Sequence, residues 1–83
     1  MKYISFEIDG MPRVATVTFP DFLNHSEVSK YISLLMRRTL DADEVKPVSA
    51  GFCNIQDVVC FGESESLRLK SDHMRDEMSL EGR

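Results

Sequence analysis

Two short segments near the N-terminus, residues 2–8 and 13–19, place most of their apolar side chains at every second position. A period of two is typical of strands, because successive side chains point to opposite faces of a sheet. Residues 9–12, Asp-Gly-Met-Pro, supply turn chemistry between the two segments. We therefore expect an antiparallel hairpin in which Phe6 faces Ala15. The apolar set that this register gathers on one face is Ile4, Phe6, Ile8, Ala15, Val17 and Phe19.

The next segment predicts a helix from His25 to Leu40. Asn24 followed by Glu27 is a variant of the capping box, which marks the start of a helix. Arg37 and Arg38 lie in the last turns, where cations complement the helix dipole. The apolar stripe at helical spacing is Val28, Tyr31, Ile32, Leu35, Met36 and Thr39.

The remaining residues predict further strands at 45–53 and 58–61, a short fifth strand at 67–70, and a last helix from Ser71-Asp72 to near Gly82. Eighty-three residues hold a single domain. The expected fold is α+β: two layers, with an antiparallel sheet of four or five strands packed on one main helix, in the order ββαββ(β)α. The expected core is Ile4, Phe6, Ile8, Ala15, Val17, Phe19, Val28, Tyr31, Ile32, Leu35, Met36, Val48, Phe52, Val59 and Phe61.

Charge and hydropathy exclude several classes. Ten Lys and Arg face fourteen Asp and Glu, a formal charge of −4, and the basic residues are scattered rather than arranged in a stripe. Binding to nucleic acid is therefore not expected. No apolar stretch approaches the ~18 residues that a membrane span needs. The first ten residues lack the apolar region of a signal peptide, so we expect a cytoplasmic protein.

The Cys and His side chains able to ligate a metal are Cys53, Cys60, His25 and His73. Structural zinc usually takes its cysteines from a C-x₂₋₄-C knuckle, whereas six residues separate this pair. No glycine pattern forms a phosphate loop or a dinucleotide fingerprint. We expect no metal, no cofactor and no enzymatic activity. A thiol enzyme is the least favoured class, because no flanking motif joins a cysteine to a histidine.

The two cysteines flank the turn between the third and fourth strands. A turn centred between Gln56 and Asp57 places Cys53 directly opposite Cys60, at a distance that a disulfide could bridge. A turn shifted by one residue pairs Cys53 with Val58 instead. In a reducing cytosol we expect thiols in either register.

One face of these two strands predicts an interface. Its candidate residues are Cys53, Ile55, Val58 and Cys60, which are far less polar than the outer face of the first hairpin. A sheet that is apolar on both faces is normally covered on both. Either the C-terminal segment with Met74 and Met78 covers this face, or another chain does. We predict a homodimer formed through the outer face of the hairpin of residues 51–60 or through the edge of that hairpin, because small domains need apolar cover.

Residues 60–71, CFGESESLRLKS, resemble stretches of small phage or prophage orphan proteins. The resemblance implies a short accessory protein that binds a host or phage protein. The sequence therefore favours a non-catalytic protein-binding module, such as a phage-type inhibitor or regulator. The alternative is a nucleic-acid-associated accessory protein that uses Lys30, Arg37 and Arg38.

Overall fold

The alternating N-terminal segments form the predicted hairpin. The computed structural model describes residues 1–82, and in it β1 (Lys2–Ile8) pairs antiparallel with β2 (Ala15–Phe19). Phe6 faces Ala15, as the alternation predicts. The register is set by the need to gather the apolar side chains on one face.

Two further strands complete an antiparallel sheet of order β2-β1-β3-β4. β3 (Val45–Asn54) pairs with β1 along most of its length, and β4 (Val59–Phe61) pairs with the end of β3. The register of β1 against β3 shifts where Phe6 meets Pro47. Proline has no N–H to donate to a ladder, so an irregularity of this kind is where a sheet tolerates it.

The helix α1 (His25–Leu40) has the predicted bounds and covers one face of the sheet. The side chain of Asn24 caps its first turn by accepting a 2.8 Å hydrogen bond from the Ser26 N–H. The buried cluster beneath the helix is Ile4, Phe6, Ile8, Phe19, Val45 and Ala50, with Val28, Ile32 and Met36 of α1 packed against it.

Four residues that the sequence analysis placed in the core are exposed instead: Tyr31, Leu35, Val59 and Phe61. Val28, Ile32 and Met36 form the stripe that meets the sheet, and Tyr31 and Leu35 lie on its flank. Helix α1 packs on β1 and β3, so the side chains of β4 extend beyond its cover. The apolar stripe predicted for α1 is therefore wider than the part of the helix that contacts the sheet.

The chain then turns away from the sheet at Gly62, whose φ is +76°. Here it passes directly over Gly51, where a Cβ atom would collide with the carbonyl oxygen of Phe61. Beyond this crossing, β5 (Glu63–Ser64) and β6 (Leu69–Lys70) form a separate two-stranded ladder. The predicted fifth strand therefore exists in part, but it does not join the main sheet.

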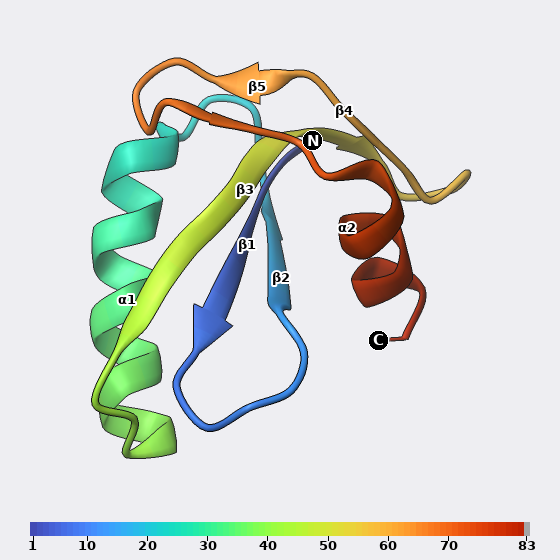
Figure 1. Ribbon diagram of the computed structural model, residues 1–83. Helices are drawn as coiled ribbons and strands as arrows, with labels where there is room; N and C mark the ends of the chain where they lie inside the picture. The colour runs from blue at the N-terminus through green and yellow to red at the C-terminus, as the bar shows by residue number, and fades with distance from the viewer. Residues whose placement is uncertain (83) are drawn as a thin grey trace.

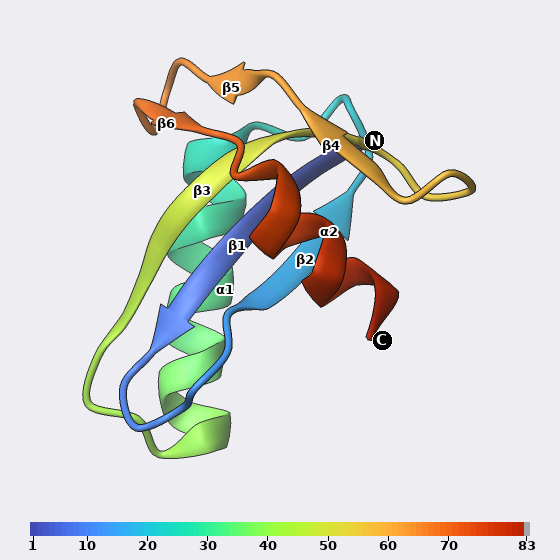
Figure 2. The same cartoon turned by 45° about the vertical axis from the view of Figure 1, so that its right-hand side comes forward.

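The last helix, α2 (His73–Glu81), begins at its Asp72 cap as predicted. It lies on the face of the sheet opposite α1, so the sheet is enclosed between the two helices (Figure 1). Turned by 45°, the fold shows α2 in front of the strands and α1 behind them (Figure 2). The α+β class and the order ββαββ(β)α are confirmed. No helix within residues 1–82 is long and apolar enough to cross a membrane.

Candidate functional site

Helix α2 packs on the sheet through a polar side chain. Asp76 is 0% exposed, whereas Met74 and Met78 are 78% and 69% exposed. The sequence analysis left open whether the C-terminal segment covers the second face of the sheet, and it does. The two methionines named for that role point away from it, and Leu80 supplies the apolar contact.

Asp76 is held by three hydrogen bonds. Its Oδ2 accepts from the Tyr3 hydroxyl at 2.5 Å and from the Asp72 backbone N–H at 3.0 Å, and its Oδ1 accepts from the Ser49 hydroxyl at 2.7 Å. Arg75 lies beside the carboxylate, with its Nε 3.7 Å from Oδ1. Burial, and then the hydrogen bond to Asp76, raise the pKa of Tyr3. This carboxylate is sealed from solvent, so it fixes α2 to the sheet rather than facing a substrate.

The outer edge of β4 is closed by the same helix. The Cys60 backbone N–H donates to a Glu77 carboxylate oxygen at 2.9 Å, and the His73 Nδ1–H donates to the Cys60 carbonyl. These two side chains take the place of a neighbouring strand. Edge strands that are covered in this way do not pair with other chains.

The four residues of the predicted interface are not brought together on one surface. Cys53 and Cys60 are buried beneath α2 with Tyr3. Ile55 lies exposed on the turn between β3 and β4, and Val58 is half-buried there with a φ of 53°. Only the turn residues are therefore accessible to another chain.

The Cys60 thiol is a poor nucleophile in this fold. Burial raises its pKa to about 12, and electrostatic interactions with Asp76, Cys53 and Glu77 act in the same direction. The nearby His73 uses its Nδ1 on the Cys60 carbonyl oxygen. A catalytic pair needs a thiolate and an imidazole that faces the sulfur.

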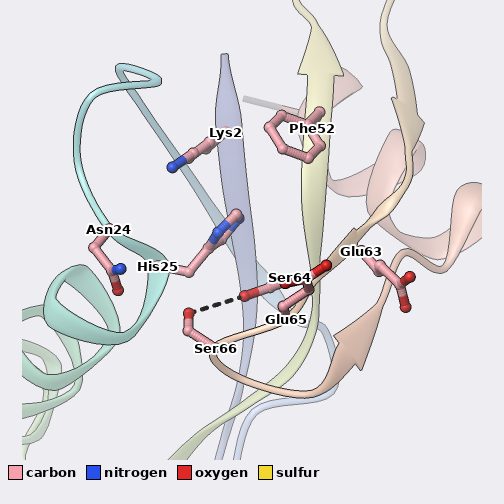
Figure 3. Close-up of a pocket in the computed structure, with 8 residues that line it drawn as sticks. All are labelled: Lys2, Asn24, His25, Phe52, Glu63, Ser64, Glu65 and Ser66. Carbon is pink, nitrogen blue, oxygen red and sulfur yellow. Dashed lines mark hydrogen bonds between the residues drawn. The ribbon is translucent and has the colours of Figure 1, made fainter.

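An open pocket of about 700 Å³ lies where the start of α1 meets the β5–β6 hairpin (Figure 3). Its lining residues are Lys2, Asn24, His25, Phe52, Glu63, Ser64, Glu65 and Ser66. Several of the polar groups already hold the chain in place. The Lys2 ammonium donates to the Leu23 carbonyl at 2.9 Å, and the Ser64 and Ser66 hydroxyls lie 3.4 Å apart.

His25 is the only imidazole that lines this pocket. Its Nε2 lies 3.0 Å from the Gly51 carbonyl oxygen, which only accepts, so Nε2 carries the proton. Phe19 and Phe52 pack edge-on against the ring at 5.4 and 6.0 Å between ring centroids. Burial lowers the pKa of His25, so the ring is neutral at pH 7. It acts as a structural link between α1 and β3.

A second, apolar groove of about 340 Å³ runs between β2 and α1. Its lining residues are Val17, Thr18, Phe19, Leu23, Asn24, Glu27, Val28, Tyr31 and Ile32. Tyr31 is 68% exposed at its rim, and Leu23, Leu34 and Leu35 are also exposed. Among residues 1–82, Glu27 is the one charged residue in the lining. Exposed apolar side chains that gather in one place mark binding surfaces more reliably than single ones do.

The groove lies beside a free strand edge. Met1 and Cys53 exchange both of their backbone hydrogen bonds, at 2.7 and 3.1 Å. In an antiparallel sheet, successive residues of a strand direct their backbone groups to alternate sides, so the even-numbered residues of β1 bond to β2. Ile4 therefore bonds to Val17, and the N–H and C=O of the next residue, Thr18, point away from β1. Among the described residues, β2 has no strand beyond it.

Lys30, Arg37 and Arg38, the residues of the nucleic-acid alternative, are all exposed on α1. Lys30 and Arg37 are two turns apart and share one side of the helix, whereas Arg38 lies about 100° further round. They form no single stripe. Within residues 1–82, no three His, Cys, Asp or Glu side chains gather in a way that would hold a metal ion.

No protein-family model, curated protein or solved structure matches this chain. Its function must therefore be argued from the surfaces described above.

Sequence reasoning missed the groove and the buried carboxylate. The signal for the carboxylate was present, because Tyr3, Ser5 and Ser49 place hydroxyls on one face of the sheet. A face of this kind is buried only against polar partners.

Proposed function

We propose that this chain is a non-catalytic protein-binding module that takes up an extended strand of a partner protein along β2. The observation that carries the proposal is the free edge at Thr18 beside the apolar groove of α1. An added strand would gain main-chain hydrogen bonds from the edge and side-chain contacts from the groove.

The accessible part of this edge is short and one-sided. Ser79 donates to the Val14 carbonyl at 3.1 Å, and Thr16 is only 6% exposed, so α2 closes that end of β2. The open part runs from Val17 to Phe19 and continues into the groove. A symmetric pairing of β2 with β2 of a second copy would need the closed end as well.

Charge also favours a different protein over a second copy. The groove carries the single acidic residue Glu27, and the whole chain has a formal charge of −4. Two copies would bring like charges together. We therefore propose a partner strand that places an apolar side chain in the groove and a Lys or Arg near Glu27. An inhibitor or regulator of a phage or host protein would act through such contacts.

A displayed library of random twelve-residue peptides tests this proposal. We expect the chain to select peptides that alternate apolar residues and carry a basic residue. Tyr31→Asp should lower the affinity for the selected peptides at least about tenfold, because it places a charge at the rim of an apolar site. The matched control is Leu40→Asp, which lies nine residues on and about half a turn around the helix.

A backbone test separates strand addition from simple adhesion to the groove. Thr18→Pro removes the outward N–H, so it should abolish peptide binding while the circular dichroism spectrum stays native. Selected peptides that bind Thr18→Pro and Tyr31→Asp as well as the native chain would overturn the proposal.

Sedimentation equilibrium tests the other occupant of this surface. The sequence analysis predicts a homodimer through the outer face or the edge of the hairpin of residues 51–60, and Ile55→Asp should weaken such a dimer more than it weakens folding. A dimer that Thr18→Pro dissociates would show that a second copy occupies β2, and it would overturn the proposed partner protein. A monomer at high micromolar concentration would support it.

A further inference from the structure

Cys53 and Cys60 stand directly opposite one another across β3 and β4. Of the two registers that the sequence allows, the structure has the one that pairs the cysteines. Residues that pair across a ladder point to the same face, and both side chains lie in one buried cluster with Tyr3.

The position in the ladder decides how close the two residues come. Cys53 uses its backbone N–H and C=O on Met1, and Cys60 uses its own on Glu77 and His73. The two cysteines therefore form a non-hydrogen-bonded pair, for which the Cα atoms are typically about 4.5 Å apart. Disulfides span Cα separations of about 4.4–6.8 Å, and the separation typical of such a pair lies within this range.

We propose that Cys53 and Cys60 are a redox modification site, at which a low-molecular-weight disulfide such as oxidised glutathione converts the thiol pair into a cross-strand disulfide. The structure holds both residues as thiols, which is the reduced state of the site. This inference is independent of the strand-binding function proposed above.

The exchange balances in two steps. One cysteine thiolate attacks oxidised glutathione, forms a mixed disulfide and releases one glutathione thiolate, which takes up a proton. The second cysteine thiolate attacks the protein sulfur of the mixed disulfide and releases the other glutathione. Over both steps the protein loses two S–H bonds and gains one S–S bond. The S–S bond of oxidised glutathione breaks, and the two electrons and two protons that the protein loses form two glutathione thiols.

Helix α2 controls access to the site. Cys60 is 0% exposed, and His73 and Glu77 hold the helix to its backbone. Glutathione therefore reaches a sulfur only after α2 has lifted from the sheet. The docked helix also keeps the thiol protonated, because burial raises the pKa of Cys60 to about 12. Local opening of this kind occurs in the less stable parts of a fold, such as a short terminal helix.

Intact-mass analysis tests the site on the full chain in glutathione buffers of increasing oxidised fraction, quenched with acid and alkylated. We expect the native chain to lose two hydrogens and to retain no glutathione. The matched controls Cys53→Ser and Cys60→Ser lack the second thiol, so each should accumulate the mixed disulfide instead.

A rate measurement tests the role of α2. Asp76→Asn weakens the docking of the helix, so it should speed oxidation at least about tenfold. Oxidation at the native rate in this variant would overturn the gating role. A native chain that stops at the glutathione adduct, or that forms only intermolecular disulfides, would overturn the site itself.

Discussion

At the scale of single residues, Asp76 is the side chain of α2 that is buried against the sheet. Three donors converge on its carboxylate at 2.5–3.0 Å, and the group is fully buried. The Asp76 carboxylate is the hydrogen-bond acceptor for the Tyr3 hydroxyl, the Ser49 hydroxyl and the Asp72 N–H. A buried charge is tolerated only when it is satisfied in this way, so the loss of one acceptor leaves several donors unpaired.

Asp76→Ala should therefore lower the free energy of unfolding by about 3 kcal/mol, because it removes hydrogen bonds to a charged group and leaves their donors buried. Urea unfolding followed by circular dichroism measures the change. The control Asp43→Ala alters an exposed loop carboxylate and should stay within about 0.5 kcal/mol of the native chain. Equal effects of the two substitutions would show that the Asp76 network contributes nothing.

At the scale of elements, α2 packs on the sheet with a polar side chain, whereas an amphipathic helix usually buries its apolar side chains. It buries Asp76 and turns Met74 and Met78 to solvent. The sheet face beneath it explains this orientation, since that face presents the Tyr3 and Ser49 hydroxyls. The polar face of the sheet, rather than the hydropathy of the helix, therefore determines which side of α2 packs against it.

The double substitution Met74→Ser with Met78→Ser should change the free energy of unfolding by less than about 0.5 kcal/mol, because both side chains are exposed. Leu80→Ala should cost about 1–2 kcal/mol, since Leu80 packs against the cluster of Tyr3, Cys53 and Cys60 and is partly buried. Chemical denaturation of both variants provides the comparison. A larger loss from the methionine pair than from Leu80 would mean that α2 docks the other way round.

At the scale of the whole molecule, one edge of the sheet is closed and the other is open. Helix α2 satisfies the backbone of Cys60 on β4, whereas β2 keeps the outward groups of Thr18 beside an apolar groove. The same helix seals Tyr3 and Cys60. The free energy of unfolding therefore depends on keeping the Tyr3 hydroxyl and the Cys60 thiol protonated inside the fold.

Stability should fall as the pH rises above about 9. The folded pKa of Cys60 is raised to about 12, and that of Tyr3 is raised above its ordinary value near 10. A raised folded pKa gives stability that is complete below the unfolded pKa and is lost as the pH rises through the folded value. Each group should contribute a slope of about 1.4 kcal/mol per pH unit, from pH 9 for Cys60 and from pH 10 for Tyr3.

Urea midpoints measured from pH 8 to 11 check this dependence. Tyr3→Phe removes one titrating group, so its slope above pH 10 should be about half that of the native chain. A native profile that stays flat from pH 9 to 11 would show that neither group is protected by folding.

Local patterns in the sequence determined the hairpin, the bounds of α1 and the caps at Asn24 and Asp72. Alternation, helical spacing and capping act between residues that are close in the chain, so the sequence shows them directly. Only the tertiary structure decided the rest. The exposure of Tyr31 depends on where α1 meets the sheet. The burial of Asp76 depends on hydroxyls that lie 73 and 27 residues away in the chain. Contacts at such separations leave no period in the sequence, because their partners are chosen only when the helix and the sheet meet.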